Sequence, residues 1–206
     1  MLDRFIVFEG LDGAGTTTQS AELVRRIQAN GSSCDHDCEP TGGVLGTQIR
    51  RVLRGAESLH PCTLALLFAA DRHEHLYAPD TGIIDRLEAG HTVVSDRYVY
   101  SSLAYQGVAC GSEFVERANA RYPHPQLLFF LEVPVSVCLE RISGRGPVEL
   151  YEKEHFLSKV AERYAEVIER AERDGVAVHR LDGTRPADSI AEEVWRIVAE
   201  TPIVSM

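Results

Sequence analysis

The fold is decided by residues 5–29, which read FIVFEGLDGAGTTTQSAELVRRIQA. The apolar run at 5–8 is typical of a short buried strand, and the glycines at 10–15 predict a tight turn directly after it. From Thr17 onward the residues favour a helix that ends before Asn30-Gly31. This order of strand, glycine-rich turn and helix is typical of an α/β domain.

The turn between this strand and helix has the residues of an anion-binding loop except at one position. Residues 10–17, GLDGAGTT, fit the pattern G-x-x-x-x-G-K-[ST] with Thr16 in place of the lysine. Glycines let successive backbone N–H groups point inward, and the start of a helix adds unpaired N–H groups and a positive dipole end. The hydroxyl of Thr17 is placed to contact Mg²⁺. The residues predicted to hold donor phosphates are Gly10, Asp12, Gly13, Ala14, Gly15, Thr16, Thr17 and Thr18. A glycine-rich turn without a ligand is the open alternative.

Further short apolar runs recur along the chain, separated by longer stretches that are compatible with helices. They lie at 92–94, 127–131 and 176–178, with a weaker candidate at 32–38, while residues 151–173 have helical spacing. This alternation predicts an α/β fold with a mainly parallel sheet. No composition shift marks a second domain, so we expect a single domain over residues 1–206. The glycines and proline at 143–147 predict a short lid at about 143–152.

Composition and charge limit the classes of partner. The 206 residues include 31 acidic and 21 basic side chains, a formal net charge of −10, which argues against a general nucleic-acid-binding role. An anionic ligand would therefore need a local basic cluster, and before Lys153 every basic side chain is arginine or histidine. No run reaches the ~18 apolar residues of a membrane span, and the first residues lack a signal-peptide profile. We therefore expect a cytoplasmic protein whose five cysteines are reduced thiols.

An ordered series of motifs from residue 5 to about residue 190 resembles the thymidylate kinase family. The series opens with residues 8–19 (FEGLDGAGTTTQ), continues with 39–43 (EPTGG) and 67–72 (LFAADR), and reaches its most diagnostic block at 95–107 (SDRYVYSSLAYQG). Residues 131–134 (LEVP), 139–142 (LERI) and 182–186 (DGTRP) complete it. One of these matches alone would be weak, but the ordered set is strong.

The resemblance implies a fold and a reaction. The fold is a three-layer P-loop NTPase fold, with a five-stranded parallel sheet flanked by helices and a short lid. The reaction is ATP + dTMP ⇌ ADP + dTDP, with Mg²⁺, in dTTP biosynthesis, by a homodimer whose interface is expected to include Leu64, Leu67 and Phe68. Such phosphoryl transfer requires positioning and charge neutralisation rather than a covalent intermediate.

Candidates for the acceptor phosphate and sugar lie near the ends of the predicted strands. Arg97 follows the strand at 92–94, where open α/β sheets bind ligands, and a guanidinium suits a phosphate dianion. By resemblance Arg97 grips the acceptor phosphate and Asp12 faces the acceptor 3′-hydroxyl, and both are expected to be catalytic together with Arg145. Glu39, at the end of the second strand, is a further candidate for substrate binding. A surface ion pair is the alternative for Arg97.

Candidates for the acceptor base come from two later segments. Phe68 and Arg72 are four residues apart, so a helix places both on one face. By resemblance Phe68 stacks on the pyrimidine and Arg72 donates to a base carbonyl, whereas the sequence alone favours a core position for Phe68. Tyr105 is expected to close against the sugar, and Ser102 and Gln106 to bond the base edge. Ser102 is shorter than the amide that bacterial members often carry, which leaves the base preference open.

Candidates for the donor side are a metal ligand and two arginines. Asp96 stands where an acid would approach Mg²⁺ together with Thr17, with helix capping as its alternative. Arg145 is the best lid candidate, and Arg141 either assists it from one turn earlier or pairs with nearby acids.

Two cations that relatives use are missing from this chain. Thr16 replaces the lysine of the turn, and residues 148–151 lack a further lid arginine. An active kinase would rely on the remaining arginines and Mg²⁺, with Lys153 as a candidate substitute. The alternatives are a nucleotide-binding pseudokinase with little turnover and a kinase for a deoxynucleoside or another nucleotide.

The remaining cysteines and histidines give weak signals. Cys34, His36 and Cys38 share one strand face, but no second ligand pair stands at zinc spacing, so an ordinary strand is expected. Cys62 and Cys110 are isolated in the sequence. His73 and His75 are expected to be structural or solvated.

Overall fold

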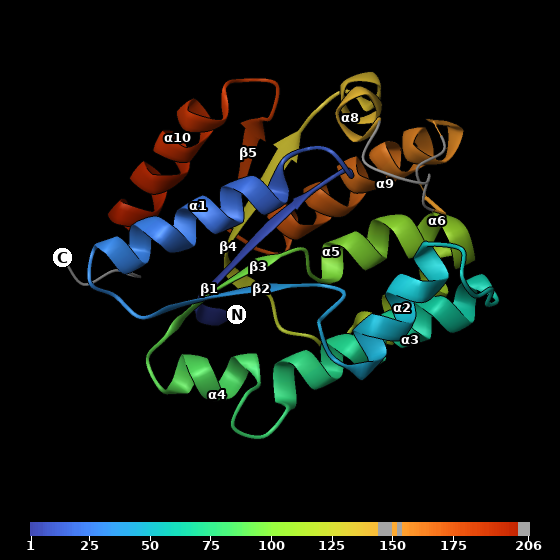
Figure 1. Ribbon diagram of the computed structural model, residues 1–206, viewed down its shortest axis with the longest axis horizontal. Helices are drawn as coiled ribbons and strands as arrows, with labels where there is room; N and C mark the ends of the chain where they lie inside the picture. The colour runs from blue at the N-terminus through green and yellow to red at the C-terminus, as the bar shows by residue number, and fades with distance from the viewer. Residues whose placement is uncertain (144–149, 152–153, 202–206) are drawn as a thin grey trace.

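The computed structural model describes residues 1–143, 150–151 and 154–201 and shows a three-layer α/β arrangement (Figure 1). All strands of its sheet are parallel, in the order β2-β3-β1-β4-β5. The strands are β1 (Leu2–Gly10), β2 (Cys34–Cys38), β3 (Thr92–Asp96), β4 (Pro125–Glu132) and β5 (Val178–Asp182). The predicted fold class is therefore confirmed. The apolar run at 176–178 predicts the last strand too early, since β5 begins at Val178. Val176 is buried without belonging to the strand.

Helices cover both faces of the sheet. α1 (Thr16–Ala29) and α10 (Ala187–Glu200) lie side by side on one face, as Figure 1 shows. The other face is covered by α4 (Ile83–Glu88), α5 (Val99–Ser101) and α9 (Glu154–Arg173). The remaining helices are α2 (Val44–Leu53), α3 (Pro61–Tyr77), the π-helical turn η1 (Ser102–Gln106), α6 (Gly107–Cys110), α7 (Ser112–Asn119) and α8 (Val135–Ile142). In the described ranges no helix is both long and apolar enough to cross a membrane.

The central strand forms the middle of the core. The side chains at 5–8 of β1 are fully buried, and the ring of Phe8 stacks on that of Phe129 in β4 at 5.0 Å. A strand with helices on both faces needs apolar side chains in both directions, which explains its unbroken apolar run. Burial of each such side chain stabilises the fold by roughly 1.5–3 kcal/mol.

The parallel register brings the carboxyl ends of four strands to one edge of the sheet. Asp96 of β3 is level with Phe8 of β1 and with Cys38 of β2. Gly10 at the end of β1 is level with Leu131 of β4. Ligands bind beyond the carboxyl ends of strands in open α/β sheets. The glycine-rich turn, Glu39 and Arg97 therefore emerge next to one another.

The expectation of five reduced thiols is wrong for two cysteines. Cys62 and Cys110 form a disulfide with a Cα–Cα distance of 5.1 Å. It joins the first turn of α3 to the end of α6, a proximity created by helix packing between segments 48 residues apart. Cys34, Cys38 and Cys138 are free thiols.

The helices bear on two further predictions, the helix over 151–173 and the dimer interface at Leu64. The helix predicted over 151–173 is described over Glu154–Arg173, and Tyr151 is a turn residue. Leu64 is 1% exposed and belongs to the core, so it does not offer a surface to a partner, whereas Leu66 and Tyr77 on the same helix are 51% and 44% exposed. Most of the predicted lid, including Arg145, lies outside the described residues.

Candidate active site

The glycine-rich turn has a backbone that requires its glycines. Gly13 and Gly15 have positive φ angles of 87° and 103°, a region that side chains with a Cβ rarely adopt. A Cβ on Gly13 would also lie 2.6 Å from the carbonyl oxygen of Cys138 in α8. α1 begins at Thr16, immediately after the turn. The predicted donor residues 10–18 are thus assembled as a turn and the first residues of a helix, the arrangement that binds phosphate through backbone N–H groups.

A guanidinium lies at the turn in which the lysine is missing. Thr16 itself is nearly buried, at 5% exposure. Arg141 of α8 donates to the carbonyl oxygens of Gly13 and Ala14 at 3.4 and 3.5 Å, and to that of Gly183 at 3.0 Å. These contacts link the turn to the segment after β5. Arg141 therefore places a positive charge beside the turn instead of pairing with an acid among the described side chains.

Thr17 and Asp96 meet where a divalent cation is expected. The Thr17 hydroxyl donates to Asp96 Oδ2. The other carboxylate oxygen, Asp96 Oδ1, is buried and has no hydrogen-bond partner within the described part of the chain. A buried anionic oxygen without a partner is costly in the absence of a cation. Carboxylate and hydroxyl oxygens are ligands that suit Mg²⁺, so these two residues fit the predicted metal.

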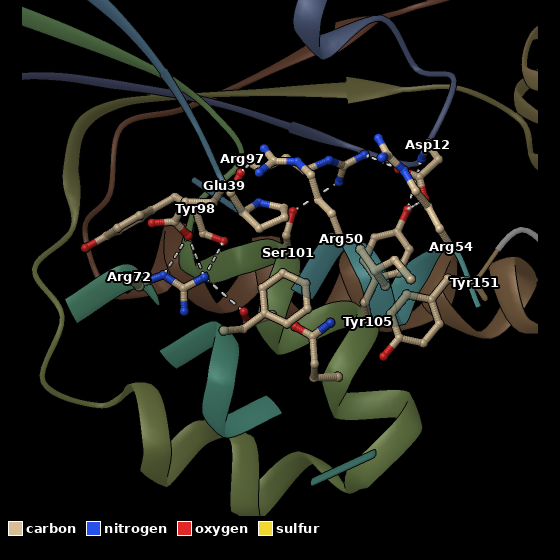
Figure 2. Close-up of a pocket in the computed structure, with 15 residues that line it drawn as sticks. Asp12, Glu39, Arg50, Arg54, Arg72, Arg97, Tyr98, Ser101, Tyr105 and Tyr151 are labelled. Carbon is tan, nitrogen blue, oxygen red and sulfur yellow. Dashed lines mark hydrogen bonds and ion pairs between the residues drawn. The ribbon is translucent and has the colours of Figure 1, made fainter. Parts of the chain in front are cut away.

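A cavity of about 210 Å³ opens beside the turn, at the same edge of the sheet. All eight predicted substrate-binding residues line it: Asp12, Glu39, Phe68, Arg72, Arg97, Ser102, Tyr105 and Gln106. Figure 2 shows Asp12 and Tyr105 at one end of the lining and Arg72 with Glu39 at the other. Among the described lining residues, four arginines stand against two carboxylates. This local excess of positive charge counters the negative charge of the whole chain.

Asp12, Arg97 and Tyr105 form a connected group at the end of the cavity next to the turn. Arg97 donates to Asp12 Oδ1 at 2.7 Å and to the carbonyl oxygen of Gly10 at 2.8 Å. Its backbone has a positive φ of 75°, which costs energy for a side chain with a Cβ. The Tyr105 hydroxyl donates to Asp12 Oδ2 at 3.1 Å and accepts the Asp12 N–H at 3.0 Å. Burial, and next the charge of Asp12, raise the pKa of Tyr105 well above its ordinary value, so it stays a donor.

The far end of the cavity is built around the buried side chain of Arg72. Its guanidinium pairs with Glu39 Oε2 at 2.7 Å and donates to Ser102 Oγ at 2.9 Å and to the carbonyl oxygen of Tyr98 at 3.2 Å. A further hydrogen bond goes to Asn119 Oδ1. Arg72 is 1% exposed and Phe68 is half-buried beside the cavity. Phe68 and Arg72 therefore lie on one face of α3, as their spacing of four residues predicts.

Gln106 offers the cavity an acceptor that no described residue uses. It is 2% exposed, and its Oε1 has no hydrogen-bond partner within the described residues. Burial raises the pKa of Tyr151, and a hydrogen bond with the Gln106 side chain acts in the opposite direction. Within the described part of the chain, the amide is therefore held by Tyr151 and presents its oxygen without a partner. Such an atom suits a ligand that brings a donor.

Several lining residues and one buried carboxylate are not predicted from the sequence. The unpredicted lining residues are Pro40, Arg50, Leu53, Arg54, Tyr98, Ser101 and Tyr151. Glu9 is fully buried, and its carboxylate accepts from the backbone N–H groups of Tyr98 and Ser101 and from the hydroxyls of Ser101 and Tyr164. Burial raises the pKa of Glu9, although Arg97 opposes this. A carboxylate inside an apolar strand was the available signal for Glu9, whereas nothing local marks Tyr151.

The predicted ordinary strand at Cys34, His36 and Cys38 is present as β2, and no cluster of metal-ligating side chains is found within the described ranges. The ring of His75 contacts Asp37 and Glu39, whereas His73 is exposed.

A profile of the thymidylate kinase family matches residues 8–194. The chain belongs to this family. It is 40% identical over 203 residues to the "Putative thymidylate kinase" of Treponema pallidum, with 97% of each chain covered. It is also 40% identical to the "Putative thymidylate kinase" of Aeropyrum pernix, with 88% of this chain and 86% of the relative covered, and to the "Probable thymidylate kinase" of Methanocaldococcus jannaschii, with 82% and 84% covered.

Membership of the family makes the chain a nucleoside monophosphate kinase, a transferase that uses nucleotides as donor and acceptor. Phosphorylation of dTMP is supported, and the pseudokinase and deoxynucleoside kinase alternatives are not favoured. The roles of individual residues stay predictions.

Proposed function

We propose that this chain transfers the terminal phosphoryl group of ATP to dTMP, with Mg²⁺ as the metal cofactor. The observation that carries the proposal is the position of the cavity: it opens from the phosphate-binding turn at the carboxyl edge of the sheet, with Asp12 and Arg97 between the two. A donor phosphate on the turn and an acceptor in the cavity would therefore face each other. Bringing two reactants together in this way is the main contribution of such enzymes.

The acceptor phosphate needs no general base. A phosphate monoester loses its second proton at roughly pH 6, so its oxygens are already nucleophilic at neutral pH. What it needs is a cation that holds it, and we assign this role to Arg97, whose guanidinium Asp12 orients at 2.7 Å. Asp12 then accepts a hydrogen bond from the acceptor sugar. Tyr105 closes the sugar end through its bonds to Asp12.

The base end of the cavity suits thymine. Phe68 supplies an aromatic face, and Arg72 and Ser102 supply polar atoms at the base edge. The Oε1 of Gln106, which no described residue bonds, suits the N3–H of thymine, because cytosine presents a lone pair at that ring position. These contacts give the site its preference for dTMP.

The donor side relies on backbone groups, guanidinium groups and Mg²⁺. Thr17 and Asp96 would hold Mg²⁺, which neutralises charge on the donor phosphates when bound. Residues 10–18 bind the phosphates through N–H groups, and Arg141 adds a positive charge beside them. The family resemblance assigns the role of the lid arginine to Arg145. We therefore propose that Thr16 does not abolish activity.

We further propose a cytoplasmic homodimer, because both nucleotides are cytoplasmic metabolites and α3 exposes Leu66 and Tyr77. The excess of acidic residues argues against nucleic acid as a partner.

A coupled assay of ADP release tests the proposal. We expect turnover with ATP, Mg²⁺ and dTMP, loss of turnover with EDTA, and little turnover with thymidine in place of dTMP. Arg97→Met should lower kcat/KM for dTMP at least 100-fold, whereas Arg25→Met, which removes an exposed arginine of α1, should not. Turnover that equals the buffer control, or equal rates with thymidine and dTMP, would contradict the proposal.

A further inference from the structure

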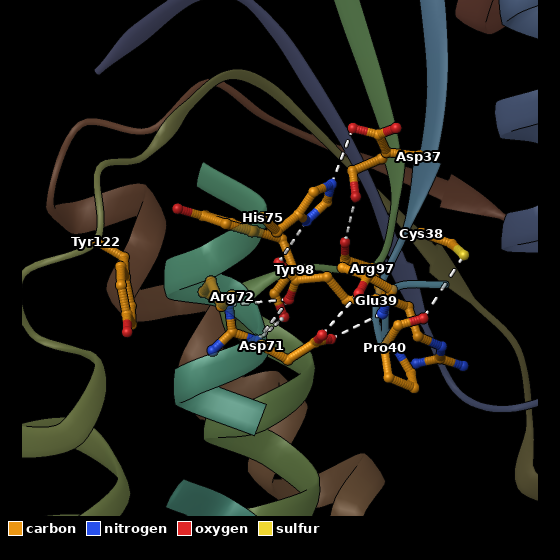
Figure 3. A network of polar contacts seen from close by, with 12 residues as sticks. Asp37, Cys38, Glu39, Pro40, Asp71, Arg72, His75, Arg97, Tyr98 and Tyr122 are labelled. Carbon is orange, nitrogen blue, oxygen red and sulfur yellow. Dashed lines mark hydrogen bonds and ion pairs between the residues drawn. The ribbon is translucent and has the colours of Figure 1, made fainter. Parts of the chain in front are cut away.

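A row of alternating charges runs along β2 towards the acceptor cavity. Three carboxylates at alternate positions face cationic side chains of α3 and α4. The row consists of Asp35, Arg86, Asp37, His75, Glu39 and Arg72. Only its last two members line the cavity, so the rest of the row lies outside the lining of the acceptor site. Figure 3 shows two of these other members, Asp37 and His75, beside Glu39. The proposed function gives no role to these other members.

The imidazole of His75 lies between two carboxylates. Its Nδ1 is 3.1 Å from Glu39 Oε1 and its Nε2 is 2.8 Å from Asp37 Oδ2, and its side chain is only 9% exposed. A carboxylate oxygen can only accept, so both ring nitrogens must carry a proton to make both bonds. This geometry requires the positively charged imidazolium.

The groups that face His75 come from three elements. Asp37 also pairs with Arg86 of α4. Glu39 also pairs with Arg72, which lies on α3 together with His75. Asp35, the next carboxylate, contacts Arg86 at 3.7 Å and His91 at 2.9 Å. With neutral His75, the two guanidinium groups would have to balance three carboxylates. Burial alone would lower the pKa of His75, but hydrogen bonds with Asp37 and Glu39 raise it to about 9.

We propose that His75 is a positioning residue that, in its protonated form, fixes Glu39 and, through Glu39, the Arg72 guanidinium at the base end of the acceptor cavity. Glu39 uses one carboxylate oxygen for His75 and the other for Arg72. Arg72 in turn contacts Ser102 on the opposite wall. Loss of the proton turns one of the two His75 bonds into a repulsive contact, which lets Glu39 and Arg72 move. The choice of dTMP as the affected substrate rests on the proposed function, whereas the protonation state does not.

Nuclear magnetic resonance of ¹⁵N-labelled histidine tests the protonation state without any substrate. The signal of His75 is assigned by its loss in His75→Gln. We expect both ring nitrogens to be protonated at pH 7.5, with a titration midpoint near pH 9. Asp37→Asn should move that midpoint to lower pH, because it removes one of the two facing charges. A neutral ring at pH 7.5, or a midpoint at or below the ordinary value of roughly 6.5, would overturn the proposal.

Steady-state kinetics test the positioning role. His75→Gln should raise KM for dTMP about tenfold, equivalent to about 1.4 kcal/mol, and leave KM for ATP unchanged. In the unmodified protein KM for dTMP should rise as the pH increases through 9, and His75→Gln should lose this rise. His73→Gln, on the exposed side of the same helix, is the matched control and should change neither quantity. Ionisation of the thymine base changes KM for dTMP equally in the unmodified protein, His75→Gln and His73→Gln, so it does not account for a difference between them.

The outcomes separate the two proposals. If His75→Gln lowers kcat and stability but keeps the alkaline rise of KM, its role is only structural and the inference is overturned. If the unmodified protein has no activity with dTMP while His75 titrates near pH 9, the proposed function fails and the assignment of the charged imidazolium stands.

Discussion

Replacement of Gln106 by methionine should weaken the preference for thymine. The side chain is 2% exposed, lines the cavity, and carries a buried oxygen without a partner in the described residues. An unsatisfied buried acceptor costs about 1–3 kcal/mol. Thymine relieves this cost with its N3–H, whereas cytosine does not. Because about 1.4 kcal/mol corresponds to a factor of ten, the unmodified protein should favour dTMP over dCMP by roughly 5–150-fold from this contact alone.

Methionine has a similar volume and no acceptor, so Gln106→Met should lower kcat/KM for dTMP by a similar factor and leave that for dCMP unchanged or higher. The assay is the coupled measurement of ADP release with each acceptor. Gln28→Met is the matched control, since Gln28 is an exposed glutamine of α1 whose amide bonds the carbonyl oxygen of Cys34 at 2.8 Å. A dTMP-to-dCMP ratio that stays constant in a folded Gln106→Met protein would refute the reasoning.

Three further predictions concern the turn, the disulfide and pH. Thr16→Lys should leave kcat unchanged or lower it, because the turn already has a neighbouring guanidinium; a large gain in kcat would show that the missing lysine is uncompensated. Cys62→Ser should lower the free energy of unfolding in urea by roughly 4 kcal/mol, the loop-entropy effect expected for cysteines 48 residues apart, with Cys38→Ser as the control; equal midpoints would contradict this. The pKa of His75 is raised from 6.5 to about 9, so its stabilisation is complete below pH 6.5 and is lost as the pH rises through 9. The difference in unfolding free energy between the unmodified protein and His75→Gln should therefore shrink from pH 6 to pH 9.5, and a constant difference would contradict the assignment.

Local patterns were sufficient to predict the sheet and the phosphate-binding turn. An apolar run followed by closely spaced glycines constrains the backbone within a few residues, and the structure has β1, the turn and α1 in that order. The family motifs then placed eight residues that the fold brings to one cavity. These features depend on neighbouring residues or on motifs that retain their order.

Other features depend on packing between distant segments and left no local signal. The Cys62–Cys110 disulfide requires α3 and α6 to meet, although the two cysteines are 48 residues apart. The row of alternating charges forms only when α3 and α4 pack against β2. The sequence around His75 therefore gives no sign of its two carboxylate partners. The start of β5 was misplaced because Val176 is buried without belonging to the strand.

The central claim is that main-chain N–H groups, arginines and a divalent cation can hold two nucleotides without the turn lysine. Isothermal titration calorimetry with a non-hydrolysable ATP analogue and with dTMP measures this most directly. We predict that dTMP binds with or without Mg²⁺, that Mg²⁺ strengthens binding of the ATP analogue, and that Asp96→Asn removes this strengthening. Absence of binding heat for both nucleotides in the presence of Mg²⁺, confirmed by an unchanged melting temperature, would contradict the account.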